Sequence, residues 1–333
     1  MAARHGGPDV LEVIEEEVPE PGPGEVRVKL LAAGVAFGDI MWQTGKVPGS
    51  PKPPYTPGYD LVGTVDRLGP GTTGFDEGQR VMGLINYGGY AEHVCAPSDK
   101  LVAVPDDLDP SILACLPLNY LTAYQLFRRV GKLERGKRVL VHGAAGGLGS
   151  AALDVGRLLE LEMYGTASAP KHELVTSLGA TAIDYRSEDF VERINDLTGN
   201  GVDLVIDHIG GAHLARSFAT LRPGGRLIMT SSYASVRGEQ STAQALLGML
   251  RVGLWNALPN RRSAQLFDIV ALNKKHPEWY REDLLALTGF LAEGKLKPVI
   301  AERFPLDQAR QAQERVLAAE ARGKVILIPQ LGA

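Results

Sequence analysis

The chain has 333 residues, of which 44% are hydrophobic, and this length suits about two domains of roughly 150 residues each. Thirty-nine acidic against 35 basic residues leave a net charge of −4, so no basic face is available for the phosphates of a nucleic acid. The two cysteines, Cys95 and Cys115, cannot form a disulfide framework. The composition therefore excludes a disordered chain, a nucleic-acid-binding protein and a disulfide-stabilised secreted domain.

No part of the sequence has the length and hydropathy of a membrane anchor. The longest uncharged apolar run, residues 30–38, is far shorter than the roughly 20 residues that span a bilayer. The first 13 residues lack the apolar centre of a secretory signal. We therefore expect a cytoplasmic protein that acts on a small molecule and has no membrane partner.

The first 100 residues read as short strands separated by glycine and proline. Their strand-forming segments are 25–31, 60–68, 79–84 and 90–96. We expect a β-rich, barrel-like unit here. At the other end, two helical stretches (281–294 and 306–321) and a last strand (324–329) are expected to pack back on this unit.

From about residue 120 the pattern changes to short apolar strands that alternate with amphipathic helices. The predicted strands are 137–143, 162–168, 181–185, 202–210 and 226–232. Such alternation is typical of βαβ units on a parallel sheet. The sequence therefore predicts an α/β protein, with a doubly wound parallel sheet of the Rossmann type beside the β-rich unit.

A glycine loop lies between a predicted strand and a predicted helix in residues 138–159. On the GxGxxG frame, Ala144, Gly146 and Gly149 occupy the three positions. Without side chains at the last two, the backbone can approach a pyrophosphate, and the helix N-terminus supplies N–H donors. A tight turn without a ligand is the alternative. The residues predicted to bind the cofactor here are Ala145, Gly146, Gly147 and Leu148.

The end of the second Rossmann strand indicates which cofactor is bound. An NAD site places a carboxylate there for the ribose 2′-hydroxyl. This strand ends at Ser168 without a carboxylate, and Lys171 follows three residues later. A hydroxyl and an ammonium suit a 2′-phosphate, so the sequence predicts NADPH. An exposed lysine in the first turn of the next helix is the alternative for Lys171.

The chain resembles the medium-chain dehydrogenase/reductase superfamily, specifically its zinc-independent quinone oxidoreductase branch. The resemblance covers nearly the whole length through the ordered segments HGGPDVLEV, PYTPGYDLVGTVDRLGPG, GGYAEHV, HGAAGGLGSAALDVGRLL, LRPGGRLI and GKVILIP. It implies a GroES-like catalytic domain from residues 1–119 with 276–333 and a Rossmann NADPH-binding domain from 120–275. It also implies a cleft between the domains and a homodimer.

The resemblance also assigns roles to single residues. It implies that Tyr185 contacts the 2′-phosphate with Ser168 and Lys171. Further cofactor contacts are implied at Asn119, Thr122, Ile209, Gly210, Ser231 and Lys324.

Positions that carry zinc ligands in related alcohol dehydrogenases have changed in this sequence. The ligating cysteine, three residues before Asp39, is replaced by Ala36. The later Gly-His-Glu reads Gly58-Tyr59-Asp60, and the histidines show no metal-ligand spacing. We therefore predict no metal. Asp39 and Asp60 are either a polar pair that orients the cleft or residues of a cap and a turn.

Without zinc, an acceptor must spread the negative charge that follows hydride transfer. A quinone or an α,β-unsaturated carbonyl does so, with hydrogen-bond donors in support. The candidate donors are Tyr55, Tyr59 and Asn86, and each tyrosine is equally well interpreted as a half-buried aromatic. The branch usually has Asn in place of Ala36 and Arg-x-Gly-x-Tyr where residues 43–47 stand here, which leaves quinone specificity open.

The predicted function is zinc-independent, NADPH-dependent reduction of quinones or α,β-unsaturated carbonyls. Two alternatives remain. One is an enoyl reductase of thioester-bound chains in a biosynthetic pathway, with residues 232–283 shaping an acyl tunnel. The other is a protein that binds NADPH without turnover. Segment 232–283 could also form a lid or a substrate wall, although helical stretches with Leu and Met at this spacing are more often a plain packing surface.

Overall fold

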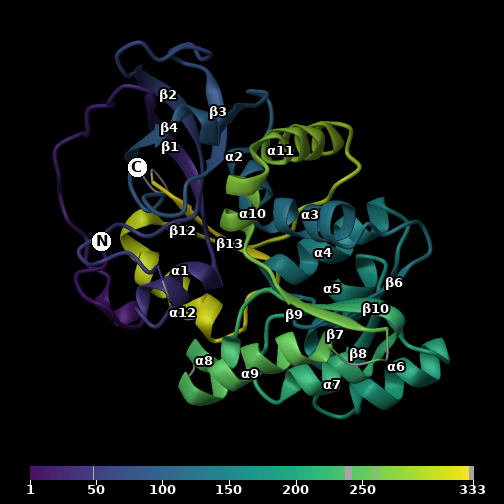
Figure 1. Cartoon of the computed structure of the whole chain (residues 1–333). Coiled ribbons are helices and arrows are strands. Elements are labelled where there is room, and N and C mark those ends of the chain that lie inside the picture. The colour runs from purple at the N-terminus through teal and green to yellow at the C-terminus, as the bar shows by residue number, and fades with distance from the viewer. Residues whose placement is uncertain (48, 237–241, 258, 260, 330–333) are drawn as a thin grey trace. The chain divides into compact units, whose positions relative to one another are not determined.

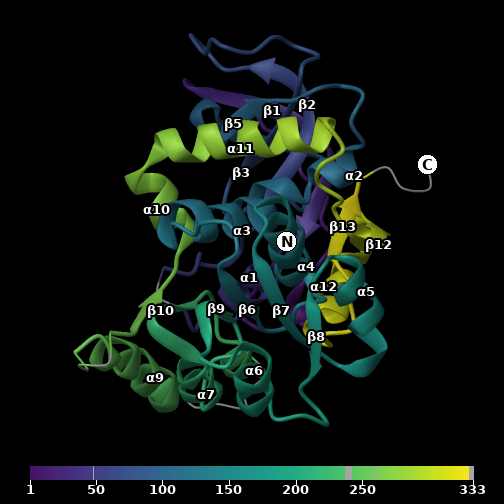
Figure 2. The ribbon, with the colours of Figure 1, turned by 90° about the vertical axis from the view of Figure 1, so that its right-hand side faces the viewer.

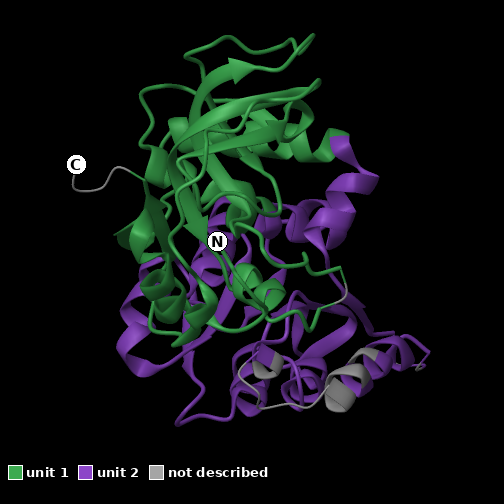
Figure 3. Ribbon diagram, turned by 90° about the vertical axis from the view of Figure 1, so that its left-hand side faces the viewer, with its two compact units in different colours: residues 1–121, 278–333 green, residues 122–277 purple. Residues whose placement is uncertain are grey.

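The computed structural model describes residues 1–329 except 48, 237–241, 258 and 260. The chain divides into two compact units, and two chain segments form the first of them (Figure 3). Unit 1 comprises Met1–Leu121 with Glu278–Ala333, and unit 2 comprises Thr122–Pro277. The C-terminal segment therefore belongs to the same unit as the N-terminal one.

Unit 1 is built on a mixed sheet of seven strands. Its strands are β1 (Glu25–Val35), β2 (Asp60–Leu68), β3 (Arg80–Leu84), β4 (His93–Pro97), β5 (Leu101–Ala103), β12 (Ile300–Pro305) and β13 (Lys324–Ile328). The order is β12-β13-β1-β2-β3-β5, and β4 also pairs with β1. Of the strand pairs described in this sheet, β12–β13 is parallel and the others are antiparallel. The central strand β1 alternates outward and buried residues, and its valines Val26 and Val28 pack on Leu61 and Val65 of β2.

Helices complete unit 1. They are α1 (Phe37–Gln43), α2 (Pro110–Leu113), α11 (Pro277–Ala292) and α12 (Ala309–Leu317). Helix α11 is attached to the sheet through Tyr280, whose hydroxyl donates to the carbonyl of Lys100 at 2.6 Å and accepts the Leu84 N–H at 3.0 Å. A further helix, α3 (Leu121–Gln125), lies between two π-helical turns where the chain passes into unit 2.

Unit 2 is built on a parallel sheet of six strands. These are β6 (Arg138–Val141), β7 (Glu162–Ala167), β8 (Thr181–Asp184), β9 (Val202–Asp207), β10 (Leu221–Met229) and β11 (Ser263–Leu266). The order is β11-β10-β9-β6-β7-β8. The chain therefore builds outward from β6 in one direction and from β9 in the other. In open parallel sheets, ligands bind at the carboxyl ends of the strands where this reversal occurs.

Helices cover both faces of the unit 2 sheet. The helices of unit 2 after α3 are α4 (Gly147–Leu158), α5 (His172–Ser177), α6 (Phe190–Thr198), α7 (His213–Ala219), α8 (Tyr233–Val236), α9 (Thr242–Trp255) and α10 (Ile269–Lys275). Figures 1 and 2 show α4 and α5 on one face and α6, α7 and α9 on the other. This arrangement confirms the predicted fold class, a Rossmann sheet with a separate β-rich unit. Within the described part of the chain, no helix is both long and apolar enough to cross a bilayer.

Candidate functional site

The glycine loop of unit 2 lies between the end of β6 and the start of α4. A Cβ atom on Gly149 would lie 2.4 Å from the carbonyl oxygen of Gly143 and 2.7 Å from backbone atoms of Ala144, so only glycine allows the helix to pack this closely. A Cβ on Gly146 would meet only the Gly143 carbonyl, at 3.4 Å. At Gly149 the loop is therefore tightly packed against its own backbone, whereas at Gly146 there is room for a ligand to approach. This shape fits a pyrophosphate that approaches the backbone at the N-terminus of α4.

The loop after β9 reaches the same edge of the sheet, because β9 pairs with β6 through Ile206 and Val141. The carboxylate of Asp207 accepts the backbone N–H groups of Ile209 at 2.8 Å and Gly210 at 3.0 Å. Gly210 has φ +81°, a conformation that glycine adopts without strain. The predicted residues Ile209 and Gly210 therefore form a fixed turn beside the glycine loop.

Three predicted cofactor residues follow the ends of β7 and β8. The register pairs Ala167 of β7 with Asp184 of β8, so Ser168 and Tyr185 come one residue after neighbouring strand ends. The N–H of Lys171 donates to the Ser168 carbonyl at 2.8 Å, which closes the turn between them. The structure therefore brings Ser168, Lys171 and Tyr185 to one edge of unit 2, and no carboxylate stands at position 168.

Two charged residues at this edge were not singled out from the sequence. The guanidinium carbon of Arg186 lies 5.9 Å from the ring centroid of Tyr185. The Asp184 carboxylate accepts the Arg186 N–H at 3.1 Å and the Ser187 hydroxyl at 3.0 Å, and so points into its own turn. Hydrogen bonding to the Arg186 N–H is the largest cause that lowers the pKa of Asp184. Arg186 could have been found in the sequence, because it is a basic residue directly after the predicted strand 181–185.

A buried cluster of polar side chains supports the loops after β6 and β9. Asp207 accepts hydrogen bonds from the Ser217 hydroxyl at 2.6 Å and from His213 Nδ1 at 3.1 Å, and His142 Nε2 lies 3.0 Å from the same hydroxyl. Burial lowers the pKa of His142 to about 3, so this imidazole is neutral. His142, Asp207 and His213 place ligand-type atoms within 4.8 Å of one another. Because the Ser217 hydroxyl bridges these groups, the cluster forms a continuous hydrogen-bond network that ties α7 to the two strands.

The remaining predicted cofactor residues are distributed over both units. Asn119 and Thr122 lie three residues apart in the helical segment around α3, and both are buried. The Ser231 hydroxyl lies 3.4 Å from the carbonyl oxygen of His208, at the carboxyl end of β10. Lys324 is buried within unit 1, in β13.

An ion pair inside unit 1 occupies one position that carries a zinc ligand in related enzymes. The Lys324 ammonium lies 2.9 Å from the carboxylate of Asp60, with side chains 2% and 0% exposed. The same carboxylate accepts the N–H of Gly34. Ala36 offers no ligand atom, and the cation of Lys324 already neutralises Asp60. These residues do not fit a catalytic zinc ion, and Lys324 has an ion-pair partner inside its own unit.

The predicted proton donors come together on two hydrogen-bonded loops of unit 1. The N–H of Ile85 donates to the Tyr59 carbonyl at 2.7 Å, which places Asn86 next to this tyrosine. The Tyr59 ring packs on Trp42 with centroids 5.3 Å apart, and Tyr55 meets the ring of Tyr87 edge-on at 6.3 Å. The Tyr55 hydroxyl is buried and has no hydrogen-bond partner among the described residues. Within the described part of the chain it is therefore a donor without an acceptor.

Asp39 lies at the start of α1 and is 2% exposed. One carboxylate oxygen, Oδ2, accepts the N–H of Ala36 at 2.8 Å and the hydroxyl of Tyr90 at 2.9 Å. The other, Oδ1, has no partner among the described residues. Burial, with a smaller effect of Asp60, raises the pKa of Asp39 to about 7. Asp39 therefore serves as a helix cap rather than in a direct pair with Asp60, and its charge changes near neutral pH.

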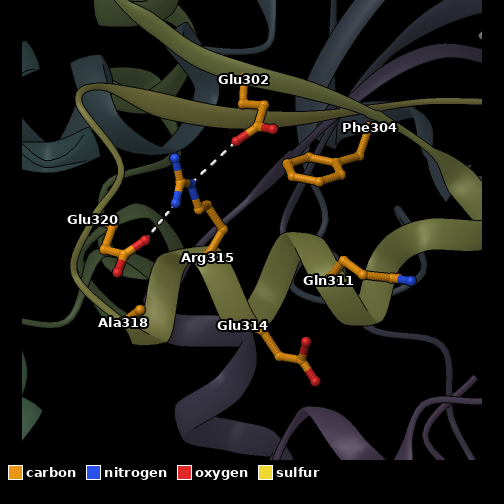
Figure 4. Close-up of a pocket in the computed structure, with 7 residues that line it drawn as sticks. All are labelled: Glu302, Phe304, Gln311, Glu314, Arg315, Ala318 and Glu320. Carbon is orange, nitrogen blue, oxygen red and sulfur yellow. Dashed lines mark hydrogen bonds and ion pairs between the residues drawn. The ribbon is translucent and has the colours of Figure 1, made fainter.

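Unit 1 also has a hollow between β12 and α12, lined by other residues than those of the candidate site (Figure 4). Its central cation, Arg315, pairs with Glu302 at 3.2 Å and also with Glu320. Apart from Phe304, which is partly buried, the residues that line it are exposed. None of the predicted site residues lines this hollow, so it does not belong to the candidate site.

Comparisons with known proteins agree with this geometry. The model of the alcohol dehydrogenase GroES-like domain matches residues 22–106, and the model named zinc-binding dehydrogenase matches residues 178–327. A human protein, synaptic vesicle membrane protein VAT-1 homolog-like, is 31% identical over 98% of this chain and 80% of its own length.

Two solved structures extend the similarity. Escherichia coli quinone oxidoreductase complexed with NADPH has a TM-score of 0.88 at 27% identity over 98% of each chain. The CurK enoyl reductase has a TM-score of 0.82 at 26% identity over 98% of this chain and 97% of that one. These matches agree with the glycine loop, with the sheet of each unit and with the substituted zinc positions. They show that this chain belongs to the zinc-independent, quinone oxidoreductase-like branch of the medium-chain dehydrogenase/reductase superfamily.

Proposed function

We propose that the protein is an NADPH-dependent reductase of quinones or α,β-unsaturated carbonyls and that it needs no metal ion. The carboxyl edge of the unit 2 sheet carries this proposal. There, an open glycine loop stands next to a strand end that offers Ser168 and Lys171 in place of a carboxylate. A dianionic 2′-phosphate is attracted by this edge, whereas a carboxylate would repel it.

The chain's own residues hold the cofactor in this proposal. The backbone N–H groups of Ala145, Gly147 and Leu148 bind the pyrophosphate, which comes close to the backbone at Gly146, while Ser168, Lys171 and Tyr185 bind the 2′-phosphate. Thr122, Asn119, Ile209, Gly210 and Ser231 line the rest of the site. NADPH, when bound, supplies a hydride. We leave Lys324 outside this set because its ammonium is paired with buried Asp60.

The acceptor follows from the charge that hydride transfer creates. A simple ketone concentrates that charge on one oxygen, for which related enzymes use zinc, and Ala36 and Asp60 do not fit that metal here. A conjugated acceptor spreads the charge, so a single hydroxyl donor suffices. The Tyr55 hydroxyl, buried without an acceptor of its own, is the donor we propose, with Tyr59 and Asn86 on the adjoining loops.

The similarity to an enoyl reductase favours a second candidate, reduction of an enoyl thioester. The chemistry is the same, because a thioester conjugated to a double bond also spreads the charge. A protein that binds NADPH without turnover is the third candidate. Parts of segment 232–283 lie outside the described residues, so its proposed role as a tunnel wall stays a prediction.

Initial rates of NADPH oxidation separate the candidates. The acceptors are one ortho-quinone, one α,β-unsaturated ketone and one enoyl thioester, each with EDTA present. Faster turnover of the free quinone or enone supports the proposal, and faster turnover of the thioester supports the second candidate. Binding of NADPH without turnover of any acceptor contradicts both. The predicted homodimer and cytoplasmic location are tested separately, by sedimentation and by cell fractionation.

A further inference from the structure

We propose that Asp39 is a positioning residue which supports turnover in its uncharged form, and that its neutrality keeps the Tyr55 hydroxyl able to donate a proton to the reduced acceptor. The inference rests on the proposed function and adds that the charge of Asp39 controls proton donation by Tyr55 within unit 1. It is carried by two buried polar atoms without hydrogen-bond partners among the described residues, Asp39 Oδ1 and the Tyr55 hydroxyl.

The surroundings of Asp39 favour the protonated carboxyl group. A carboxylate can accept about four hydrogen bonds, yet among the described residues only Oδ2 of Asp39 has donors, from Ala36 and Tyr90. An ionised oxygen without a donor at 2% exposure costs far more than a neutral one. The unpartnered Oδ1 therefore favours the protonated carboxyl group over the carboxylate.

Charged groups on the neighbouring elements do not change this balance. Asp60 on β2 and Lys324 on β13 act on Asp39 in opposite directions, and they are paired with each other at 2.9 Å. Tyr90, on the loop before β4, offers its hydroxyl rather than a charge. No cation is therefore left over among these groups to hold Asp39 as a carboxylate.

The charge of Asp39 changes the pKa of the Tyr55 hydroxyl. The two residues belong to one connected part of unit 1, because Tyr90 donates its hydroxyl to Asp39 and its N–H to the carbonyl of Pro57 at 2.9 Å. Burial and then the negative charge of Asp39 raise the pKa of Tyr55 to about 12. Ionised Asp39 therefore makes Tyr55 a weaker proton donor, and neutral Asp39 removes that penalty.

The proton balance of the step is simple. After the acceptor has received a hydride from NADPH, the O–H bond of Tyr55 breaks and a bond forms between that proton and the anionic acceptor. The electron pair stays on the Tyr55 oxygen, and solvent then returns one proton. Asp39 exchanges no atom in the step, and it only sets the free energy of the transient phenolate.

The test compares the wild type with Asp39→Asn, which is permanently neutral and keeps an oxygen for the Ala36 and Tyr90 donors. We expect kcat of the wild type to fall about tenfold as the pH rises through the pKa of Asp39, and the Asp39→Asn profile to stay flat over that range. The KM for NADPH should be unchanged in both. Exposed Asp307→Asn is the matched control and should follow the wild type.

A second readout needs neither cofactor nor turnover. The infrared C=O band of a buried carboxylic acid should be present in the cofactor-free wild type at mildly acidic pH, disappear as the pH rises, and be missing from Asp39→Asn. Identical pH profiles in the wild type and Asp39→Asn, or no such band, would overturn the inference. Absence of turnover in the wild type at every pH would instead refute the proposed function, and the infrared band would still report on Asp39.

Discussion

Removing one partner of the buried ion pair between Asp60 and Lys324 should destabilise unit 1 strongly. The two side chains are 0% and 2% exposed, and their charged atoms lie 2.9 Å apart. In Lys324→Met the Asp60 carboxylate keeps the Gly34 N–H but loses its counter-ion. An uncompensated buried charge of this kind costs about 3–5 kcal/mol of unfolding free energy. In the double variant Asp60→Asn/Lys324→Met no charge remains, so most of that loss should be recovered.

Urea-induced unfolding measures this effect. A Trp255→Phe background leaves Trp42 and Trp279 as fluorescent reporters, and both belong to unit 1. The control is Arg310→Met, which breaks the exposed pair with Glu314 and should change stability by less than about 0.5 kcal/mol. A loss below about 1 kcal/mol in Lys324→Met, or a double variant less stable than the single one, would refute the reasoning.

Three further predictions concern the cofactor edge and the buried carboxyl group. Ser168→Asp should weaken NADPH binding about 10- to 100-fold and leave NADH binding unchanged or improved, because the new carboxylate repels only the 2′-phosphate; fluorescence titration checks this. Gly149→Ala should lower NADPH affinity and cost about 1–3 kcal/mol, since its Cβ meets backbone at 2.4 Å, whereas Gly253→Ala, with open space around it, should not destabilise. The raised pKa of Asp39 means that the folded state keeps a proton which the unfolded chain has already lost. This stabilising contribution is therefore full below about pH 4 and is lost as the pH rises toward 7, and unfolding of Asp39→Asn should lack that decline.

Local patterns in the sequence predicted much of the fold. The segment predicted as a strand at 60–68 is β2, and the predicted helix before residue 159 is α4. These elements have turn residues at their ends and a regular hydrophobic period, and both patterns can be recognised from neighbouring residues in the sequence. Helix α1 and strand β11 were not predicted. Helix α1 has only seven residues, and strand β11 has one buried residue, Ala264, among its four, so neither shows a clear hydrophobic pattern.

The candidate site was partly visible in the sequence for the same reason. The glycine loop and the missing carboxylate at Ser168 are local features, and the structure places them at the edge expected for them. Contacts between distant residues were not accessible in this way. Tyr90 bonds Asp39 from 51 positions away, and Lys324 pairs with Asp60 across 264 positions. No local period encodes such pairs, so the partners of Asp39 and Asp60 emerged only from the fold.

The most direct test of the central claim is a single-turnover measurement on protein dialysed against EDTA. Enzyme loaded with NADPH is mixed with an α,β-unsaturated ketone, and loss of the reduced nicotinamide absorbance is followed, with NADH in parallel. The account predicts metal-independent oxidation of NADPH that is much faster than that of NADH. Oxidation that needs an added metal ion, or that proceeds equally well with NADH, would contradict it.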